Sequence, residues 1–324
     1  MVNISVSPHI RDRRTTASVM RDVAIALAPA LLMGVFMFGW RALEVILISA
    51  ATCVLTEFVY QKAMKLPVTV GDYSALVTGL ILAVNLPSTV PFWVPVLGGV
   101  FAILLVKQVF GGLGQNIMNP ALAARCFLII SFPALMGAGF PEVANNLLGV
   151  DVISGATPLQ ILKDGGSVDL LKLFFGFHSG CIGETSALAI LLGFVYMVAR
   201  GVITPRIPAV YVGSTVALIA LFRVIRGEPV TGEYLLGQAM GGGLLAGAVF
   251  MATDYVTSPV TVGGQWIYGV LLGLLTALFR VFGASAEGVS YAIIISNTLV
   301  PLIERITIPR PFGVPRQKKG GAAK

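Results

Sequence analysis

Hydrophobic residues gather in long stretches along the chain, and short polar segments separate them. A stretch of about 20 apolar residues matches a helix that crosses the roughly 30 Å hydrocarbon core of a membrane. The ten stretches are 23–40, 43–60, 73–86, 92–110, 121–135, 184–200, 209–226, 234–252, 266–282 and 289–303. Two of them, 73–86 and 121–135, are short for a full crossing and predict discontinuous or half helices. The pattern therefore predicts an all-α polytopic membrane protein with about ten transmembrane helices, some of them short or broken.

Composition supports this prediction. Of the 324 residues, 56% are hydrophobic and 11% are charged, whereas a soluble domain carries about 25% charged residues. We expect one membrane domain over 23–304, flanked by basic tails at 1–22 and 305–324. The net charge of +7 is typical of basic cytoplasmic loops, so we do not expect nucleic-acid binding. The 3 cysteines and 2 histidines are scattered, and we predict no metal site.

Positive charges predict which side of the membrane each loop occupies. If the N-terminus is cytoplasmic, about sixteen of the 22 Lys and Arg residues lie inside or at inner helix ends. The six outside are Arg41, Lys163, Lys172, Arg223, Arg226 and Arg280. Because cytoplasmic segments carry the excess of Lys and Arg, we expect both termini in the cytoplasm. The long loop 137–183 then lies on the outer face.

Within this loop, residues 151–160 have the pattern of a helix start. Thr157 suits the N-cap, Pro158 suits the first helical position, and Gln160 stands where a capping box has Glu or Gln. The small residues 154–156 let a bulky group approach the backbone. The unpaired N–H groups of a helix N-terminus suit a phosphate.

The pattern Asp151-x-x-Ser154-Gly155-Ala156-Thr157 matches the motif of proteins that carry FMN esterified through its phosphate to a Thr or Ser. Nearly the whole chain resembles the D subunit of the Rnf electron-transport complex and is similar, less closely, to the B subunit of the sodium-translocating NADH:quinone reductase. The other segments that carry the resemblance are 72–79, 111–121, 183–188, 251–259 and 297–304. Two mild departures are Tyr255, where the family usually has Pro, and Glu304, where it often has Asp.

The resemblance implies a function in electron transfer. FMN would be esterified to Thr157, the residues Ser154, Gly155 and Ala156 would shape the backbone around it, and Asp151 would mark the loop for a flavin transferase. The chain would be a bacterial inner-membrane subunit of a ferredoxin:NAD⁺ oxidoreductase that moves Na⁺ or H⁺. Its partners would be subunits of the A, B, C, E and G types, above all the flavin-bearing G subunit.

The resemblance also implies two inverted five-helix halves, similar to the architecture of urea channels. Residues 107–111 resemble residues 279–283, each at the end of a Gly-containing stretch, and five stretches per half would give the halves opposite orientations. This architecture also suits a channel or secondary transporter without redox chemistry. A structural anchor for other redox subunits is a further alternative, and only the flavin motif separates the redox function from these two.

Gln115, Asn116 and Asn119 form a second polar cluster. Their amide groups suit the donor and acceptor edge of a flavin ring, and the related sodium pump carries a non-covalent riboflavin in its B subunit. We favour the plainer interpretation that these residues cap a helix break.

Acidic residues within or beside apolar stretches are functional candidates, because ionisable groups at membrane depth are costly. The candidates are Glu44, Glu57, Asp72, Glu184 and Asp254. Glu57 lies deepest in its stretch, and we rank Glu57 and Asp254 first for a cation path. Asp72 and Glu184 stand at the ends of stretches, and the plainer alternative for them is that they only help a helix to begin. Arg125 stands inside a stretch and requires a partner, either one of these acids or a flavin phosphate.

Overall fold

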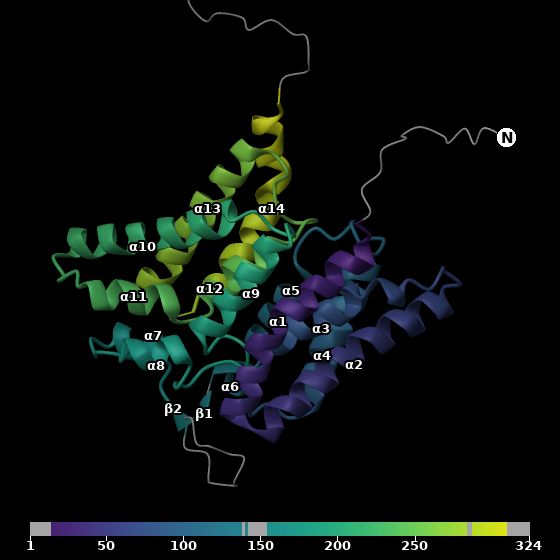
Figure 1. Ribbon diagram of the computed structural model, residues 1–324, viewed down its shortest axis with the longest axis horizontal. Coiled ribbons are helices and arrows are strands. Elements are labelled where there is room, and N and C mark those ends of the chain that lie inside the picture. The colour runs from purple at the N-terminus through teal and green to yellow at the C-terminus, as the bar shows by residue number, and fades with distance from the viewer. Residues whose placement is uncertain (1–13, 138–139, 142–153, 284–286, 310–324) are drawn as a thin grey trace, which may run out of the picture.

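The computed structural model describes residues 14–137, 140–141, 154–283 and 287–309, and helices form most of it (Figure 1). The first five apolar stretches form α1 (Thr16–Phe38), α2 (Trp40–Ala63), α3 (Ser74–Val84), α4 (Trp93–Val100) with the π-helix η2 (Phe101–Gln108), and α5 (Pro120–Ser131). The last five form α9 (Ala187–Ala199), α10 (Arg206–Arg226), α11 (Gly232–Met240) followed by α12 (Leu244–Ala246) and the π-helix η4 (Gly247–Met251), α13 (Val262–Phe282), and α14 (Val289–Thr307). The connecting elements are η1 (Val70–Asp72), α6 (Pro133–Gly137), β1 (Phe140–Pro141), β2 (Ser154–Gly155), α7 (Pro158–Lys163) and α8 (Leu170–Phe175).

Within the described residues, five helices are long and apolar enough to cross a membrane: α1, α2, α10, α13 and α14. The eighth stretch is a broken span, because α11 and the segment 244–251 meet at 55°. The short helices α3 and α5 agree with the prediction, whereas α9 and the combined α4 and η2 are also shorter than their stretches suggest. The all-α polytopic membrane fold is confirmed, with one small addition. β1 and β2 pair antiparallel, with Phe140 opposite Gly155.

Side-chain caps explain where several helices begin. Thr15 and Ser18 form a reciprocal capping box ahead of α1. Asn119 caps α5, with Pro120 at the first helical position. Helix α9 begins later than its apolar stretch because Ser186 caps it, and the Ser186 hydroxyl accepts from the backbone N–H of Ala189.

Small residues bring neighbouring helices into close contact. Gly79 of α3 lies against the backbone of α2 at Ala50, and a Cβ on Gly79 would come within 2.7 Å of the Ala50 Cα. Gly193 of α9 leaves no room for a side chain beside Ala26 of α1, and Gly273 of α13 leaves none beside Ser214 of α10. Such small contacts are typical of helix packing within membranes.

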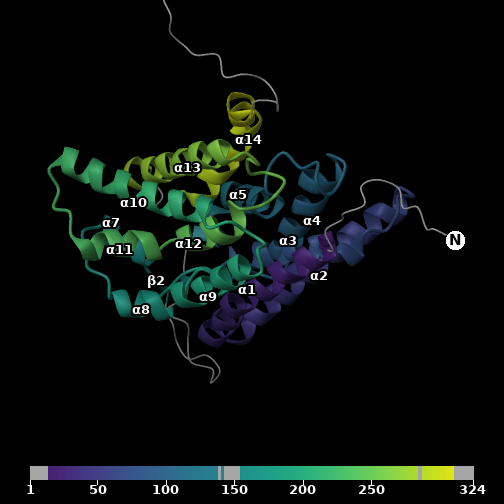
Figure 2. The ribbon, with the colours of Figure 1, turned by 45° about the horizontal axis from the view of Figure 1, so that its top comes forward.

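The two ends of the molecule differ. The start of α1 and the end of α14 lie in the upper part of Figure 1, and we call this side the terminal end. The strands β1 and β2 lie at the bottom, and we call this side the loop end. Figure 2 shows the molecule turned by 45°, and the end of α14 again lies far from β2. Helix α1 runs from the terminal end toward the loop end.

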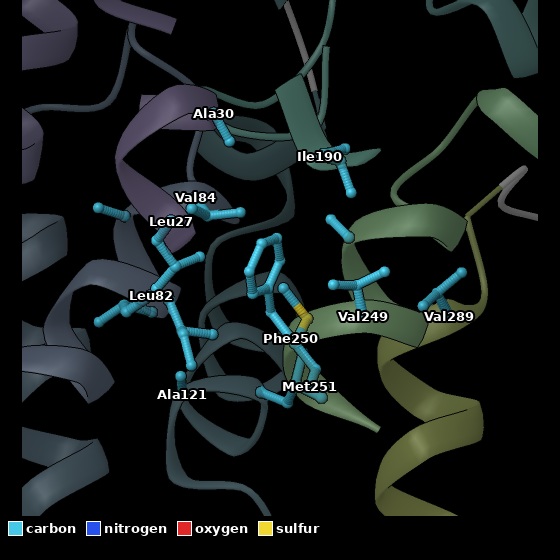
Figure 3. Packing of buried hydrophobic residues seen from close by; sticks show 14 of the residues in the cluster. Leu27, Ala30, Leu82, Val84, Ala121, Ile190, Val249, Phe250, Met251 and Val289 are labelled. Carbon is cyan, nitrogen blue, oxygen red and sulfur yellow. The ribbon is translucent and has the colours of Figure 1, made fainter. Parts of the chain in front are cut away.

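A continuous apolar core fills the space between the helices (Figure 3). Leu27 of α1 and Leu82 of α3 contribute from one side, and Val249 and Phe250 of η4 contribute from the other. The ring of Phe250 points from η4 toward Leu27 and Leu82. Burial of this surface stabilises the contact between the two sets of helices.

Candidate functional site

Thr157 begins α7, and its Oγ1 accepts a hydrogen bond from the backbone N–H of Gln160 at 3.4 Å. Pro158 is the first helical residue. The predicted capping box is only half formed, because the Gln160 side chain donates to the carboxylate of Asp164 at 3.1 Å. Thr157 is half-buried, and the preceding Ala156 is exposed.

The rest of the motif is placed in part. Ser154 and Gly155 form β2, which pairs with β1. Asp151 lies outside the described residues, so its predicted role stays a prediction. Together, the strand pair and α7 give the small residues before Thr157 a defined backbone.

Helix α7 is anchored to the second half of the chain. Leu159 packs on Gly242, whose φ of +64° and lack of space both exclude a larger residue. The Lys163 ammonium donates to the backbone oxygen of Gly283, just beyond α13, at 2.7 Å. Thr157 is therefore held at a fixed position beside the break between α11 and α12.

A pocket opens at the terminal end, and it encloses about 770 Å³ of empty space, part of it open to solvent. It lies between α1, α3, the segment before α5, and the ends of α9 and η4. Its polar lining is Ser74, Thr78, Lys107, Asn116, Asn119, Thr253, Asp254 and Tyr255. Apolar residues such as Ile81 and Phe250 complete the wall.

The amide cluster is only partly at this pocket. Asn116 and Asn119 line it, whereas Gln115 is exposed and does not. Asn119 Oδ1 accepts from the backbone N–H groups of Ala121 at 3.1 Å and Leu122 at 3.3 Å. The prediction that Asn119 caps a helix is thus confirmed. Asn119 also lines the pocket.

Glu57 and Asp72 belong to one hydrogen-bonded network, which we call the Lys107 cluster: Glu57, Asp72, Ser74, Lys107 and Gln108. All of these residues except the half-buried Asp72 are buried. The Lys107 ammonium lies 2.8 Å from Glu57 Oε1 and donates to Ser74 Oγ at 2.6 Å. Ser74 Oγ donates in turn to Asp72 Oδ1 at 2.6 Å, and Gln108 Nε2 donates to Glu57 Oε1 at 2.7 Å. Asp72 also accepts from the Ser74 backbone N–H at 2.8 Å, so it supports the start of α3. The N-cap residue is Tyr73 and not Asp72, so the predicted N-cap position is wrong by one residue.

The remaining acids lie in different surroundings. Asp254 lines the pocket and accepts from Thr257 Oγ1 at 3.2 Å. Burial raises the pKa of Asp254, although hydrogen bonds from Thr257 and the Val256 backbone act in the opposite direction. Glu44 forms an exposed ion pair with Arg41 at 3.0 Å, so it faces the surface and no buried path.

The sequence predicted either an acidic residue or a flavin phosphate as the partner of Arg125. In the structure, its partners include two acidic residues. Its guanidinium contacts residues from three other segments, and we call this group the Arg125 cluster. The contacts are Glu287 Oε2 at 2.8 Å, Glu184 Oε2 at 3.9 Å, Asn85 Oδ1 at 2.9 Å, Ser290 Oγ at 3.0 Å and Cys181 Sγ at 3.7 Å. Glu184 precedes α9, so it is not part of the first turn of that helix.

Helix α3 connects the two clusters. Ser74, its first residue, contacts Lys107, and Asn85, which follows its last residue, contacts Arg125. The segment 244–251 connects the same regions in the opposite direction: Gly243 before it lies against Glu184, and Asp254 after it lines the pocket. Tyr73 and Gly243, which precede the two segments, both have positive φ, 62° and 66°. An inverted repeat would produce this arrangement, and the repeat itself stays a prediction.

Sequence reasoning assigned no role in the site to Lys107, Glu287 or Asn85. The signal for Lys107 is present in the sequence, since a cation within an apolar stretch requires a buried partner. Asn85 lies at the end of the stretch 73–86 and Glu287 just before the stretch 289–303. Their proximity to Arg125 arises only from the packing of α3, α5 and α14.

Comparison with known proteins identifies relatives over almost the full chain. The family model described as "NQR2, RnfD, RnfE family" matches residues 3–313. The D subunit of the Na⁺-translocating ferredoxin:NAD⁺ oxidoreductase complex of Acetobacterium woodii is 46% identical, over 99% of this chain and 98% of the relative. The D subunit of the proton-translocating ferredoxin:NAD⁺ oxidoreductase complex of Clostridium ljungdahlii is 40% identical, over 97% and 96%.

A more distant relative agrees with these two. The D subunit of the ion-translocating oxidoreductase complex of Escherichia coli K12 is 35% identical, over 96% of this chain and 98% of the relative. The match of the family model and the three identities show that this chain belongs to the NQR2, RnfD, RnfE family.

Proposed function

We propose that this chain is the D-type membrane subunit of a ferredoxin:NAD⁺ oxidoreductase complex that translocates Na⁺ or H⁺. The names of the relatives at 46% and 40% identity support this function, and one of them is named for Na⁺ and the other for protons. The buried ion pairs of the structure support an ion-translocating protein, since membrane-depth charges are typical of ion pathways. The chain contributes to the enzyme as one subunit of the complex.

The observation that carries a redox role is the position of Thr157. Its hydroxyl caps a helix that is anchored at Leu159 and Lys163, and its neighbour Ala156 is exposed. We propose that this hydroxyl carries FMN through a phosphoester, with Ser154, Gly155 and Ala156 shaping the backbone and Asp151 marking the loop for a flavin transferase. The flavin supplies the capacity to accept and pass on electrons. The protein's part is to fix its distance from the next centre.

A non-covalent flavin of the riboflavin type in the terminal-end pocket is the second part of the proposal. The pocket is partly open to solvent and has a mixed polar and apolar wall, as small-molecule sites do. Its wall offers amide groups at Asn116 and Asn119 and an ammonium at Lys107, which suit the polar edge of the ring. Ile81 and Phe250 offer apolar contacts for the ring faces. Gln115 is left out, because it is exposed.

For the location, we propose the bacterial inner membrane with cytoplasmic termini and an outer, periplasm-side flavin loop. In support, the start of α1 and the end of α14 share one end of the molecule, and α7 lies toward the other (Figure 1). A, B, C, E and G-type subunits would be the partners, and a flavin-bearing G subunit on the outer side would be the nearest electron partner. Lipid surrounds the exposed apolar residues.

For the coupling ion, we propose a path that uses the Lys107 cluster and the pocket, with Glu57 and Asp254 as its main acids. Glu184, in the Arg125 cluster, and Asp72 are secondary candidates. The supporting observation is that Glu57 and Asp254 both lie near the pocket wall, Glu57 through Lys107 and Asp254 directly.

The covalent flavin is tested on the denatured protein, where a non-covalent flavin is lost. The purified polypeptide should fluoresce as a band on a denaturing gel. Mass spectrometry of its peptides should place one FMN phosphoryl group on Thr157. The channel, transporter and anchor alternatives all require a dark band and an unmodified Thr157, and that result would reject the redox proposal. Release of free riboflavin on denaturation tests the second flavin separately.

A further inference from the structure

Glu57 carries a buried carboxylate oxygen that has no hydrogen-bond partner among the described residues. The residue is 1% exposed. Its Oε1 contacts Lys107 and Gln108, whereas its Oε2 is the unpartnered atom. Buried carboxylate oxygens are normally satisfied, because an unpaired buried charge is costly. Oε2 is therefore a free ligand position inside the protein.

Lys107 stands between this carboxylate and the pocket. Its ammonium contacts Glu57 Oε1 and Ser74 Oγ, and the residue also lines the pocket. An ammonium has three donors, and the third has no acceptor in the described part of the chain. Lysine has a long flexible side chain, so the ammonium can turn from Glu57 toward an acceptor in the pocket while the helix stays in place.

We propose that Lys107 is a coupling residue: its ammonium moves from Glu57 toward negative charge in the pocket, and Glu57 then takes up one monovalent cation, H⁺ or Na⁺. This inference rests on the proposed pocket flavin. The charges balance for each electron. One electron from the redox chain of the complex adds one negative charge to the pocket, and the ammonium compensates for it. The Glu57 carboxylate loses its partner, and one cation restores neutrality.

The reverse step follows from the same balance. When the electron leaves the pocket, the ammonium returns to Glu57 and displaces the cation. In a low-dielectric interior, an uncompensated unit charge is too costly to persist, so the electron and the cation must enter together. Lys107 thus makes cation affinity at Glu57 depend on charge in the pocket, as coupling requires.

Arg125 and Asp254, two other ionisable residues in this part of the molecule, lack this arrangement. Arg125 is held by two carboxylates and by Asn85 and Ser290, and it does not line the pocket. Asp254 lines the pocket, but its side chain accepts from the Thr257 hydroxyl and does not contact a cation in the described part of the chain. Among these three residues, Lys107 is the one that contacts both a buried acid and the pocket.

The test is reduced-minus-oxidised infrared spectroscopy of the purified complex in a Thr157→Ala background, which removes the covalent flavin. We expect a carboxyl or carboxylate signal on reduction that is lost in Glu57→Gln. We expect the same loss in Lys107→Met, although Glu57 is still present there, because its carboxylate is neutralised by a cation in both redox states. Glu44→Gln is the matched control on the same helix, and it should keep the full signal.

Two further measurements keep the result decisive. Lys107→Gln is a second neutral variant that can still donate a hydrogen bond to Glu57, so it preserves folding if Lys107→Met does not, and it should also lose the Glu57 signal. Riboflavin released on denaturation reports pocket occupancy. A normal riboflavin content with an unchanged Glu57 signal in Lys107→Met would overturn the role of Lys107 alone. A wild-type complex that releases no riboflavin would overturn the pocket flavin, and the role of Lys107 with it.

Discussion

The Lys107 ammonium and the Glu57 carboxylate are 2.8 Å apart, and the two side chains are 2% and 1% exposed. The pair joins η2 to α2 inside the helix bundle. Removing Lys107 leaves Glu57 buried without a charged protein partner, so that it must take up a proton or cation, whereas removing both charges leaves two neutral groups. The energetic role of the pair can therefore be separated from its role in coupling.

We expect Lys107→Met to destabilise the protein by about 3–5 kcal/mol, the usual cost of breaking a buried ion pair. Glu57→Gln/Lys107→Met should recover most of this loss. Thermal unfolding of the detergent-solubilised protein measures both. Equal destabilisation by the single and double variants would show that the unpartnered Glu57 charge is not what destabilises Lys107→Met. Glu44→Gln breaks the exposed pair with Arg41 and should change stability by less than about 1 kcal/mol.

Thr157→Ala should leave the polypeptide in the membrane and abolish its in-gel flavin fluorescence. Thr157→Ser should retain some fluorescence, because the hydroxyl remains. The control is Thr231→Ala, which removes another threonine N-cap, that of α11, and should leave fluorescence intact. An undiminished fluorescent band from Thr157→Ala would place the covalent flavin on another residue.

Cysteine labelling tests the topology directly, because Cys53, Cys126 and Cys181 are all buried. Ala156→Cys should react with a membrane-impermeant reagent added from the outer face of intact cells. Arg305→Cys, at the exposed end of α14, should react only after the inner face is opened, and so should Lys318→Cys, which lies outside the described residues. Reaction of Ala156→Cys and Arg305→Cys from the same side would reject the ten-helix arrangement.

Arg125→Met should destabilise the protein by about 3–5 kcal/mol, since Glu184 and Glu287 lose their common cation. Arg125→Lys should recover only part of the loss, because an ammonium cannot donate to five separate partners at once. Thermal unfolding measures both variants. Wild-type stability in Arg125→Met would mean that packing of α3, α5 and α14 alone holds this region together.

Ion translocation tests the acids. Glu57→Gln and Asp254→Asn should keep the Thr157-bound flavin and lower the number of ions moved per electron by the assembled complex. Transport into vesicles, measured together with electron flux, gives this ratio. Glu44→Gln should leave the ratio unchanged. A normal ratio in both Glu57→Gln and Asp254→Asn would assign these acids a structural role only.

The apolar pattern predicted the membrane fold and the positions of its ten helical segments, because each segment is determined by local hydrophobicity. The cap at Thr157 was also predictable, since Thr157, Pro158 and the helix they begin are adjacent in sequence. The ion-pair partners were not. Lys107 follows Glu57 by fifty residues, and Glu287 follows Arg125 by more than three times that separation, so only the packed helices reveal these contacts. The exposure of Gln115 likewise depends on the loop around it.

Helix α3 places the Lys107 cluster and the Arg125 cluster at its two ends, and its 11 residues span about 16 Å at 1.5 Å per residue. That length is roughly half of the 30 Å hydrocarbon core. A unit charge that crosses a full membrane exchanges about 2.3 kcal/mol with a potential of 100 mV. With the field uniform across the core, a cation that moves from one cluster to the other exchanges about 1 kcal/mol with that potential. The rate of such a step should therefore respond to membrane voltage, and the steepness of the response gives the distance that the ion travels.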